Sequence, residues 1–236
     1  TQEEIEKELN RVGANFKKLN DNEVINQTSN DLSNGEAIGW FQGRMEFGPR
    51  ALGGRSILAD PRSSNMQKNL NLKVKYRESF RPFAPSVLEN EAKRWFDIDK
   101  TSPYMLMVAK VNEDKVMKMN NEEEKLFGIE KLNIKRSTIP AVTHVDYSAR
   151  IQTVSQNTNQ RYFNLISEFN KKTGCPILIN TSFNIRGEPI VCTPTDAFKC
   201  FMGTDLDILV IENFYLEKSQ QNKNLIFNYE SEFEPD

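Results

Sequence analysis

Helical periodicity and short apolar runs alternate over residues 159–218, and this alternation constrains the fold more than any other feature of the sequence. The spacing of apolar residues over 159–174 and 193–204 predicts two helices. The apolar runs at 175–182 and 206–218 predict two strands. Strands that alternate with helices are typical of the α/β class.

The ends of the two predicted helices carry their own signals. Gly174 closes the first helix, because glycine readily adopts the left-handed conformation that ends a helix. Thr193 caps the second helix, and Pro194 occupies its first position, where a backbone N–H is not needed. These signals support helices with sharp boundaries on either side of a buried strand.

The remaining elements are predicted from the same patterns. Further strands are expected over 37–41, 55–59, 83–88, 104–111, 139–146 and 149–155. Further helices are expected over 2–20, 63–74 (opened by serine caps) and 90–96. Polar stretches predict a loop over 20–36 and an exposed excursion over 112–137. Since the last two of these strands would pair around a tight turn at Tyr147 and Ser148, we expect an α+β type of α/β fold. Its sheet would be twisted, with mixed parallel and antiparallel strands and flanking helices.

The chain has 236 residues and begins with Thr1 instead of methionine, which favours a piece of a longer polypeptide. We expect a helix and linker from a missing upstream domain over 1–35, one domain over 36–218 and a polar tail over 219–236. No apolar run approaches the twenty residues of a membrane span. Three cysteines and a single histidine favour a reducing, cytoplasmic location and argue against a zinc or iron site within this chain.

Positive charge is concentrated in one part of a chain whose net charge is −2. Residues 43–81 contain nine Lys or Arg and three acids, which gives 9 − 3 = +6. The stretch "GWFQGRMEFGPRALGGRSILADPR" opens this region and contains Arg50 among glycines and prolines. Arginine binds phosphate or carboxylate oxygens in pairs, and glycine lets backbone approach a ligand closely. An anion-binding loop and a solvated surface loop both fit this pattern.

Three cations follow within seven residues in "KVKYRESFRPFAPS", namely Lys75, Arg77 and Arg81. Only one acid accompanies them, so they repel one another unless an anion compensates. This segment therefore indicates either a second part of an anion site or the charged face of a loop.

Small polar residues follow the apolar strand in "ILINTSFNIRGEP". Asn180, Thr181, Ser182 and Asn184 lie where ligands commonly bind in α/β sheets, beyond the carboxyl end of a strand. Their hydroxyl and amide groups can bind phosphate, ribose or a carbonyl group. The same residue types also favour turns, so a structural turn is the alternative.

Arg150 lies in an apolar strand context within "THVDYSARIQTV", where a cation needs a partner. His144 precedes it, and a lone histidine of this kind is more often structural than catalytic. The sequence contains no Walker A loop, no GxGxxG motif opening a helix and no nucleophile elbow. A nucleotide would therefore be bound by dispersed Arg, Lys, Ser and Asn side chains.

Together, these four segments resemble the C-terminal part of the O-carbamoyltransferases, over about residues 36–216. That family includes nodulation-factor, cephamycin and tobramycin carbamoyltransferases. The resemblance implies a YrdC/Sua5-like fold, whose Lys-x-Arg and Ser-x-Asn patterns match Lys75–Arg77 and Ser182–Asn184. One departure is Tyr147, where the family pattern has glycine.

The resemblance also implies a division of labour. The YrdC-like domain would bind ATP, Mg²⁺ and carbamoyl phosphate and form carbamoyl-adenylate. An N-terminal Kae1-like domain, which holds a metal through histidines, would pass the carbamoyl group to a small-molecule hydroxyl acceptor. The family pattern makes Lys75, Arg81, Arg150 and Ser182 the catalytic candidates. It assigns substrate and nucleotide binding to Arg50, Arg77, Asn180, Thr181 and Asn184, and it implies no metal site in this chain.

Two alternatives stay open on sequence alone. A threonylcarbamoyl-adenylate synthase acting in tRNA modification shares the fold and would use threonine and bicarbonate. A nucleic-acid-binding module could use the basic stretch, although aromatic residues are not interleaved with it as a single-strand platform requires.

Overall fold

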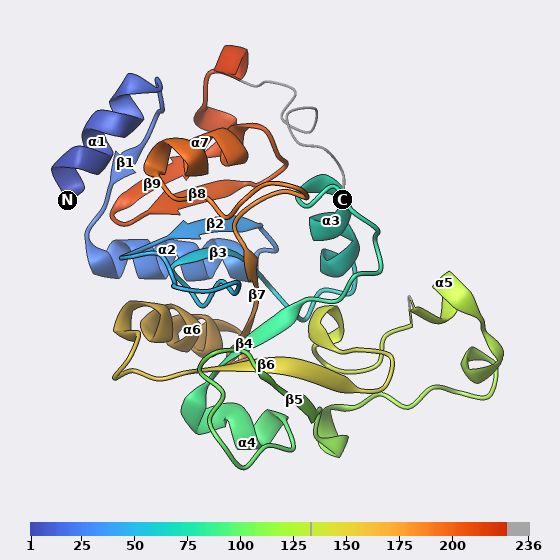
Figure 1. Cartoon of the computed structure of the whole chain (residues 1–236). Helices are drawn as coiled ribbons and strands as arrows, with labels where there is room; N and C mark the ends of the chain where they lie inside the picture. Colours follow the sequence, from blue (N-terminus) through green and yellow to red (C-terminus); the bar gives the residue numbers. More distant parts are fainter. Residues whose placement is uncertain (133, 226–236) are drawn as a thin grey trace.

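The computed structural model describes residues 1–132 and 134–225, and its centre is a single open β-sheet (Figure 1). Within these residues the sheet has nine strands, in the spatial order β1-β9-β8-β2-β3-β7-β4-β6-β5. The strands are β1 (Lys17–Lys18), β2 (Ile38–Phe41), β3 (Arg55–Ala59), β4 (Ala84–Leu88), β5 (Met107–Lys110), β6 (Ser148–Val154), β7 (Ile177–Ser182), β8 (Ile208–Ile211) and β9 (Phe214–Glu217).

The sheet mixes parallel and antiparallel pairing, as expected. The β2–β8 and β4–β6 pairs are parallel, and the other neighbours are antiparallel. Strands β2, β3, β4 and β8 are buried along their whole length, which requires cover on both faces of the sheet.

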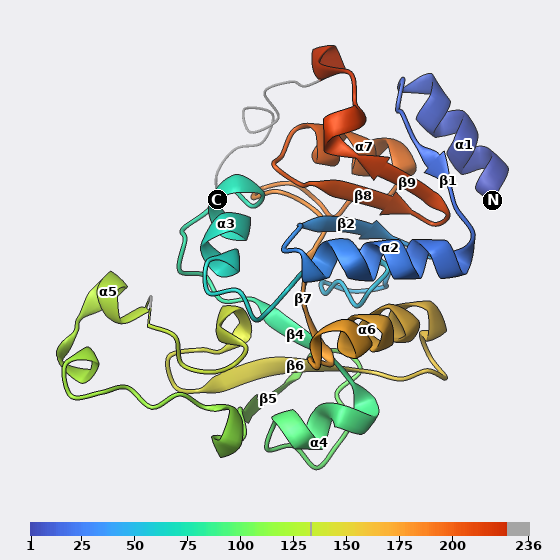
Figure 2. The same cartoon turned by 180° about the vertical axis from the view of Figure 1, so that it is seen from behind.

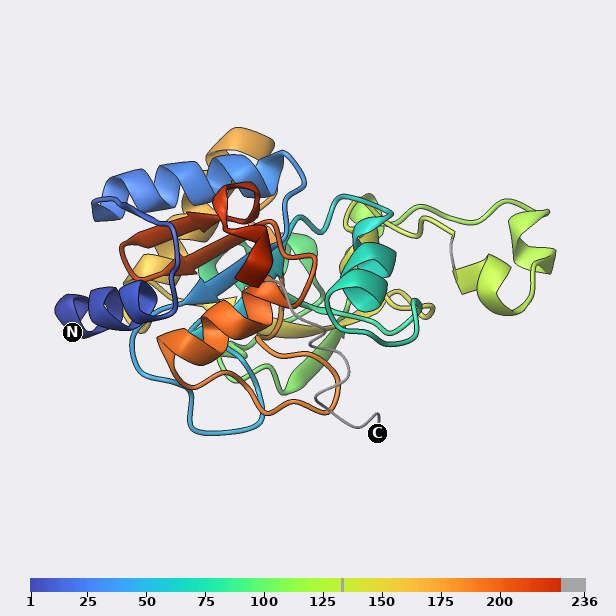
Figure 3. The same cartoon turned by 90° about the horizontal axis from the view of Figure 1, so that it is seen from above.

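Helices supply this cover. They are α1 (Gln2–Arg11), α2 (Asp21–Ser33), α3 (Met66–Lys73), α4 (Ala92–Trp95), α5 (Gly128–Leu132), α6 (Gln160–Thr173) and α7 (Pro194–Met202). Helices α2 and α6 lie side by side on one face, and α7 lies on the other with α1 against it (Figures 2 and 3). Helix α3 lies near the end of β7 (Figure 1). The α/β fold class is thereby confirmed.

The expectation of a loop over 20–36 is wrong, because residues 21–33 form helix α2. Asn20 Oδ1 accepts a hydrogen bond from the Glu23 amide, and Glu23 Oε2 accepts one from the Asn20 amide. This reciprocal cap starts the helix. Its buried face includes Thr28 and Ser29 beside Val24 and Leu32, so the apolar stripe is too interrupted to be read as helical periodicity.

Two further predictions are corrected. Residues 206–218 form two strands, β8 and β9, joined by a tight turn in which Glu212 has a φ of 49°. Residues 139–146 contain only a short 3-10 turn (Pro140–Val142) and pair with no strand, since β6 pairs with β4 and β5 instead. A close chain reversal does precede β6, because the His144 amide donates to the Ser148 carbonyl.

Other elements are confirmed with altered ends. Strand β5 is shorter than expected, α1 ends at Arg11, and α3 starts at Met66 without a serine cap, since Asn65 occupies the N-cap. Gly174 adopts the left-handed conformation after α6 with a φ of 71°, as predicted. Thr193 caps α7 through the Asp196 amide, also as predicted.

The segments expected outside the central fold differ in how they are placed. Residues preceding 36 pack on the same sheet, because β1 pairs with β9 and α1 contacts α7. The excursion over 112–137 extends away from the sheet (Figures 1 and 3), with its residue 133 outside the described set. The 226–236 part of the predicted polar tail also lies outside the described residues. No described helix is both long enough and apolar enough to cross a membrane.

Candidate functional site

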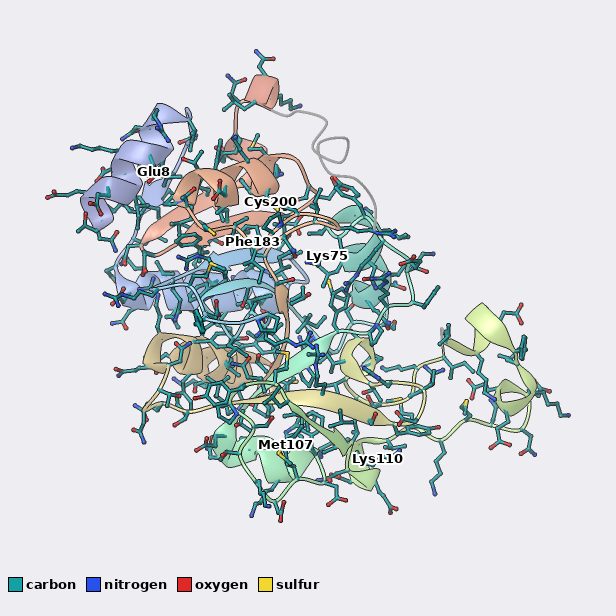
Figure 4. The ribbon with its side chains drawn as sticks, viewed as in Figure 1. Glu8, Lys75, Met107, Lys110, Phe183 and Cys200 are labelled. Atoms are coloured by element: carbon teal, nitrogen blue, oxygen red, sulfur yellow. The ribbon has the colours of Figure 1, made fainter. Side chains whose placement is uncertain are left out.

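Lys75 is the most buried of the predicted cationic site residues. It lies two residues after α3, and its amide donates to the Leu70 carbonyl at 2.8 Å, which closes the end of the helix. Its side chain points toward the end of β7 and is 3% exposed (Figure 4). The sequence therefore places an ammonium group inside the protein, where a charge requires polar partners.

Those partners are all oxygen atoms of two residues. Lys75 Nζ donates to the Ser182 carbonyl at 2.7 Å, the Asn184 carbonyl at 2.8 Å and Asn184 Oδ1 at 2.6 Å. It also lies 3.3 Å from Ser182 Oγ, which itself donates to Asn184 Oδ1 at 2.7 Å. The Lys-x-Arg and Ser-x-Asn patterns, more than a hundred residues apart in sequence, thus meet at one ammonium group.

The loop after β7 is held in shape by its own acid. Asn184 Nδ2 donates to the Glu188 carbonyl at 2.6 Å, and Glu188 Oε2 accepts from the Ile185 amide at 2.8 Å. Gly187 has a φ of 77°, a conformation that suits glycine, and this allows the chain to turn back. These bonds hold the Asn184 carbonyl in the loop next to the Ser182 carbonyl at the end of β7, and both carbonyl groups accept hydrogen bonds from Lys75.

Burial and the neighbouring charge of Arg77 lower the pKa of Lys75 to about 7. Among residues 1–132 and 134–225, no carboxylate lies within salt-bridge distance of its ammonium group. Neutral oxygen atoms therefore make the direct contacts with the charge, and the nearby charge of Glu188 only partly opposes the fall in pKa. An anion entering beside Lys75 would stabilise its protonated form.

Arg77 and Arg81 extend the positive charge outward from Lys75. Arg77 Nε donates to Asn71 Oδ1 at 2.6 Å, its guanidinium lies 5.0 Å from the centre of the Phe83 ring, and burial lowers its pKa to about 10. Arg81 is half-exposed and pairs with Glu78 at 2.8 Å. With a pKa of about 10, Arg77 remains a cation at neutral pH.

A cavity of about 450 Å³ lies between these groups. Five of the predicted residues line it, together with the loop after β7: Lys75, Arg77, Arg81, Ser182, Asn184, Ile185, Arg186, Gly187, Glu188 and Pro189. We call this the Lys75 cavity. Four cations and one acid line it, so its chemistry suits an anionic ligand of several charges.

A larger cavity, of about 650 Å³, lies beyond Tyr76, between α3 and the end of α7. Its walls include Glu36, Asp205 and Asp207, and burial together with the charge of Asp207 raises the pKa of Glu36 to about 7. Two cations, Lys73 and Lys218, also line it, so this cavity offers a polyanion less net positive charge than the Lys75 cavity does. We therefore place the candidate site in the smaller Lys75 cavity.

Asn180 and Thr181 do not line the Lys75 cavity. Asn180 is 1% exposed, and both hydrogens of its amide group are used, by the Ala51 carbonyl at 3.0 Å and by Gln152 Oε1 at 2.8 Å. Thr181 points to the opposite face of β7, since side chains alternate along a strand. Their predicted contact with substrate is therefore not part of this arrangement.

Arg50 and Arg150 form a second group. The side of the sheet that carries Ser182 and Asn180 is called the polar face below, and this group lies at the other end of it from Lys75. Register across β4, β6 and β7 places Arg150 on the side of the sheet that carries Ser182. Its guanidinium contacts Met105 Sδ at 3.9 Å, and burial together with the charge of Arg50 lowers its pKa. No carboxylate of the described chain forms a salt bridge with either arginine, and neither arginine lines the Lys75 cavity.

His144 and Tyr147 belong to the turn before β6. Burial lowers the pKa of His144, which keeps its imidazole neutral at pH 7. Tyr147 has a φ of 63°, in the left-handed region that glycine adopts without strain. The departure from the family pattern thus lies at a position whose backbone favours glycine, while Arg150 keeps its place in β6.

Three residues near the site were missed from sequence. Arg186 and Glu188 line the Lys75 cavity, and their signal was present in "NIRGEP", where a cation and an acid flank a glycine. Gln152 is a buried partner of Asn180, and nothing in its strand context marks it.

Comparisons with known proteins show the family of the chain. Residues 29–218 match the family model described as the carbamoyltransferase C-terminus. The chain belongs to this carbamoyltransferase C-terminal family. It is 55% identical over 239 residues to an uncharacterized protein of Synechocystis sp. and 42% identical over 216 residues to nodulation protein NolO of Bradyrhizobium diazoefficiens. It is also 32% identical over 194 residues to 3'-hydroxymethylcephem-O-carbamoyltransferase of Amycolatopsis lactamdurans.

These matches cover most of the chain but little of the relatives. They include 100%, 90% and 82% of this chain, in that order, and 39%, 36% and 33% of the three relatives. The chain thus corresponds to one part of larger carbamoyltransferase-family proteins.

Proposed function

We propose that this domain binds ATP and carbamoyl phosphate and joins them into carbamoyl-adenylate. The observation that carries the proposal is the Lys75 cavity, where Lys75 contacts Ser182 and Asn184 and the side chains of Arg77 and Arg81 line the same cavity. A triphosphate needs several cations at close range, because each nearby pair of anions costs a few kcal/mol even at an effective dielectric constant of about 20. Membership of the carbamoyltransferase family supports the choice of the carbamoyl group.

The reaction has two balanced steps. Water attacks the carbamoyl carbon of carbamoyl phosphate, the C–O bond to phosphate breaks, and carbamate and phosphate result. A carbamate oxygen then attacks the α-phosphorus of ATP, the bond from that phosphorus to the bridging oxygen breaks, and pyrophosphate leaves. No covalent enzyme intermediate is required, so positioning and electrostatic stabilisation supply the rate.

Each cation then has a role. Lys75 and Arg81 stabilise the charge that develops on the α-phosphoryl oxygens and on the leaving pyrophosphate. Arg77 contributes charge from the wall of the cavity. Arg50 and Arg150 bind carbamoyl phosphate and orient the carbamate. Hydrogen bonds from Ser182 and Asn184 place the reacting oxygens.

Mg²⁺ is proposed as the companion of the nucleotide. The described residues contain no cluster of three or more His, Cys, Asp or Glu side chains that could hold a metal ion by themselves. Mg²⁺ commonly keeps several waters and binds through substrate phosphates, so this site fits an ion that arrives with ATP and neutralises its phosphate charge.

The acceptor step belongs to another part of the whole protein. One relative is named for O-carbamoylation of a hydroxymethyl group, which supports a hydroxyl acceptor. The chain covers two-fifths or less of the three relatives described above, which leaves room for a Kae1-like partner domain in the same polypeptide. We propose that this partner transfers the carbamoyl group, and that the protein works in the cytoplasm.

The test is pyrophosphate release from ATP and Mg²⁺ with each carbon source. Carbamoyl phosphate should support release and give a carbamoyl-adenylate peak by mass spectrometry. Threonine with bicarbonate should not support release, and if it does so while carbamoyl phosphate does not, the domain is a threonylcarbamoyl-adenylate synthase instead. Salt-resistant binding to heparin or RNA, without release from either mixture, would favour the nucleic-acid-binding alternative.

A further inference from the structure

A chain of buried polar side chains crosses three neighbouring strands beneath the glycine-arginine loop (residues 42–54). Ser86 on β4, Gln152 on β6 and Asn180 on β7 are 0%, 4% and 1% exposed. Ser86 Oγ donates to Gln152 Oε1 at 2.5 Å, and Asn180 Nδ2 donates to the same oxygen at 2.8 Å. The Gln152 amide is thereby fixed in orientation, with its N–H groups directed away from both partners.

This chain ends on two consecutive carbonyl groups of the loop. Gln152 Nε2 donates to the Leu52 carbonyl at 2.9 Å, and Asn180 Nδ2 donates to the Ala51 carbonyl at 3.0 Å. The residue before Ala51 is Arg50. Two buried amide groups thus hold the backbone that directly follows this arginine.

The amide groups of the same loop are held from another side. Glu46 Oε1 accepts from the Leu52 and Gly54 amides at 2.6 Å each, and Ser56 Oγ accepts from the Gly53 amide at 3.0 Å. Gly53 has a φ of 105° and lies so close to the Tyr162 ring that an added Cβ would approach it to 2.4 Å. Side chains therefore replace the sheet as hydrogen-bond partners of the segment that follows Arg50.

Fixing this loop matters because Arg50 and Arg150 carry like charges without a carboxylate between them. Gln152 and Arg150 lie two residues apart on the same face of β6, and Gln152 Nε2 donates to the Leu52 carbonyl, so the backbone that follows Arg50 lies next to Arg150. The charge of Arg50 also lowers the pKa of Arg150. An unrestrained loop would move Arg50 away from Arg150, since like charges repel and solvent would hydrate the separated guanidinium. The free energy that holds the loop must come from other contacts, and the buried amides of Gln152 and Asn180 contribute to it together with Glu46 and Ser56.

We propose that Gln152 and Asn180 are positioning residues that fix the glycine-arginine loop so that Arg50 stands beside Arg150 as a two-arginine clamp for the phosphate of carbamoyl phosphate. This assignment rests on the proposed function for the identity of the anion. It also changes the role of Asn180, which was expected to bind substrate directly. With both amide hydrogens engaged, Asn180 acts on the substrate through Ala51 and Arg50.

The variants Gln152→Met and Asn180→Asp each remove one donor to the loop. Ser86→Ala is the matched control, because it removes a member of the same buried chain without removing either bond to the loop. Circular dichroism and thermal unfolding first establish that each variant is folded. Two variants keep the test possible if one of them does not fold.

The first measurement is limited trypsin digestion with mass mapping, which needs no ligand. Cleavage after Arg50 should become about tenfold faster in Gln152→Met and Asn180→Asp, while cleavage after the remote, exposed Lys118 keeps its wild-type rate. Ser86→Ala should resemble the wild type. An Arg50 bond that stays as resistant as in the wild type, in folded Gln152→Met and Asn180→Asp, overturns the proposal.

The second measurement is calorimetric binding of carbamoyl phosphate and, separately, of MgATP. The dissociation constant for carbamoyl phosphate should rise about tenfold in both loop variants, and that for MgATP should change less than twofold, because the Lys75 cavity is untouched. If cleavage after Arg50 becomes faster but the affinity for carbamoyl phosphate does not change, Arg50 and Arg150 do not act as a clamp for this ligand. If wild-type protein binds no carbamoyl phosphate at all, the proposed function fails, while the digestion still decides whether the loop is fixed by these amides.

Discussion

The two ends of the polar face differ in how far they are assembled in the protein alone. At one end, Lys75 is 3% exposed, and four oxygen atoms of Ser182 and Asn184 surround its ammonium group. At the other end, Arg150 has Met105 Sδ as its hydrogen-bond contact, and its Nε atom is buried without a partner in the described structure. The protein's own groups thus hold the Lys75 end in place, whereas no carboxylate of the described residues forms a salt bridge with the cations of the Arg150 end.

This difference separates two physical roles. A buried amine held by carbonyl groups keeps its geometry, so it can stabilise developing charge without reorganising. Paired arginines without a carboxylate gain most when a dianion binds, so they serve affinity for substrate. The four predictions below test this contrast, in order of decreasing effect.

Replacement of Lys75 should have the largest effect. Lys75→Met should lower the rate of adenylate formation at least 100-fold, a loss of about 3 kcal/mol of transition-state stabilisation. Lys73→Met, two residues earlier and exposed, is the matched control and should keep the wild-type rate. Single-turnover assays of pyrophosphate release measure both. Wild-type turnover in folded Lys75→Met would remove Lys75 from the mechanism.

The pH dependence of stability should also depend on Lys75. Its pKa is about 7 in the folded protein, below the ordinary value of 10.5 that applies on unfolding. Below pH 7 both states bind the proton, and the folded state bears the full cost of the buried charge. Between pH 7 and 10.5 the unfolded state binds more protons, so the free energy of unfolding rises with pH, by on the order of a few kcal/mol.

Urea unfolding at pH 6.5, 8 and 9.5 measures this slope. Other groups titrate in the same range, so the informative quantity is the difference between the wild type and Lys75→Met, which cannot titrate at this position. Lys73→Met should retain the wild-type slope. If the free energy of unfolding changed with pH in the same way in the wild type and in Lys75→Met, the pKa of Lys75 would not be lowered on folding. The contrast between the two ends of the polar face would then fail.

Replacement of Arg50 should have a smaller effect, confined to binding. Arg50→Ala should weaken carbamoyl phosphate binding about tenfold through loss of a charge-assisted hydrogen bond. The free energy of unfolding should stay within about 0.5 kcal/mol of wild type, because Arg50 is exposed and forms no salt bridge with any described residue. Calorimetry measures the binding of carbamoyl phosphate, and urea unfolding measures the stability. Arg44→Ala, on the same loop, is the control. Equal losses in both arginine variants would indicate general attraction and not a clamp.

The smallest effect is expected at the turn before β6. Tyr147→Gly should stabilise the protein by roughly 0.5–1 kcal/mol, because glycine relieves the strain of a positive φ but gives the unfolded chain more freedom. Thermal unfolding measures it, with His144→Ala in the same turn as the comparison. Carbamoyl phosphate affinity should not change, and a change would assign the Tyr147 ring to the Arg150 end of the site.

Sequence patterns predicted most of the sheet, and five of the predicted site residues line one cavity in the structure. The strands at 38–41, 55–59, 84–88 and 177–182 were found because their apolar runs are uninterrupted. Helix α2 was not, because Thr28 and Ser29 occupy its buried face. The pair β8–β9 was read as one strand, because two apolar runs flank a turn of only two residues, Glu212 and Asn213.

The limits at the site have a similar cause. Lys75, Ser182 and Asn184 could be predicted to meet because their patterns resemble those of one family, and in the structure Lys75 Nζ lies 3.3 Å from Ser182 Oγ and 2.6 Å from Asn184 Oδ1. Local sequence does not show whether an asparagine faces a ligand or a backbone carbonyl. Asn180 was therefore assigned to substrate, although its amide is engaged by Ala51 and Gln152.

The parallel pairing of β2 with β8 sets a condition on biosynthesis. Ile38 lies opposite Ile208, so one of the central strands receives its neighbour only after 170 further residues have been made. Contacts this distant in sequence slow folding, and a nascent chain exposes the unpaired edge of a hydrophobic strand until its partner leaves the ribosome. Completion of this sheet therefore waits for β8 and is a late step in the folding of the chain.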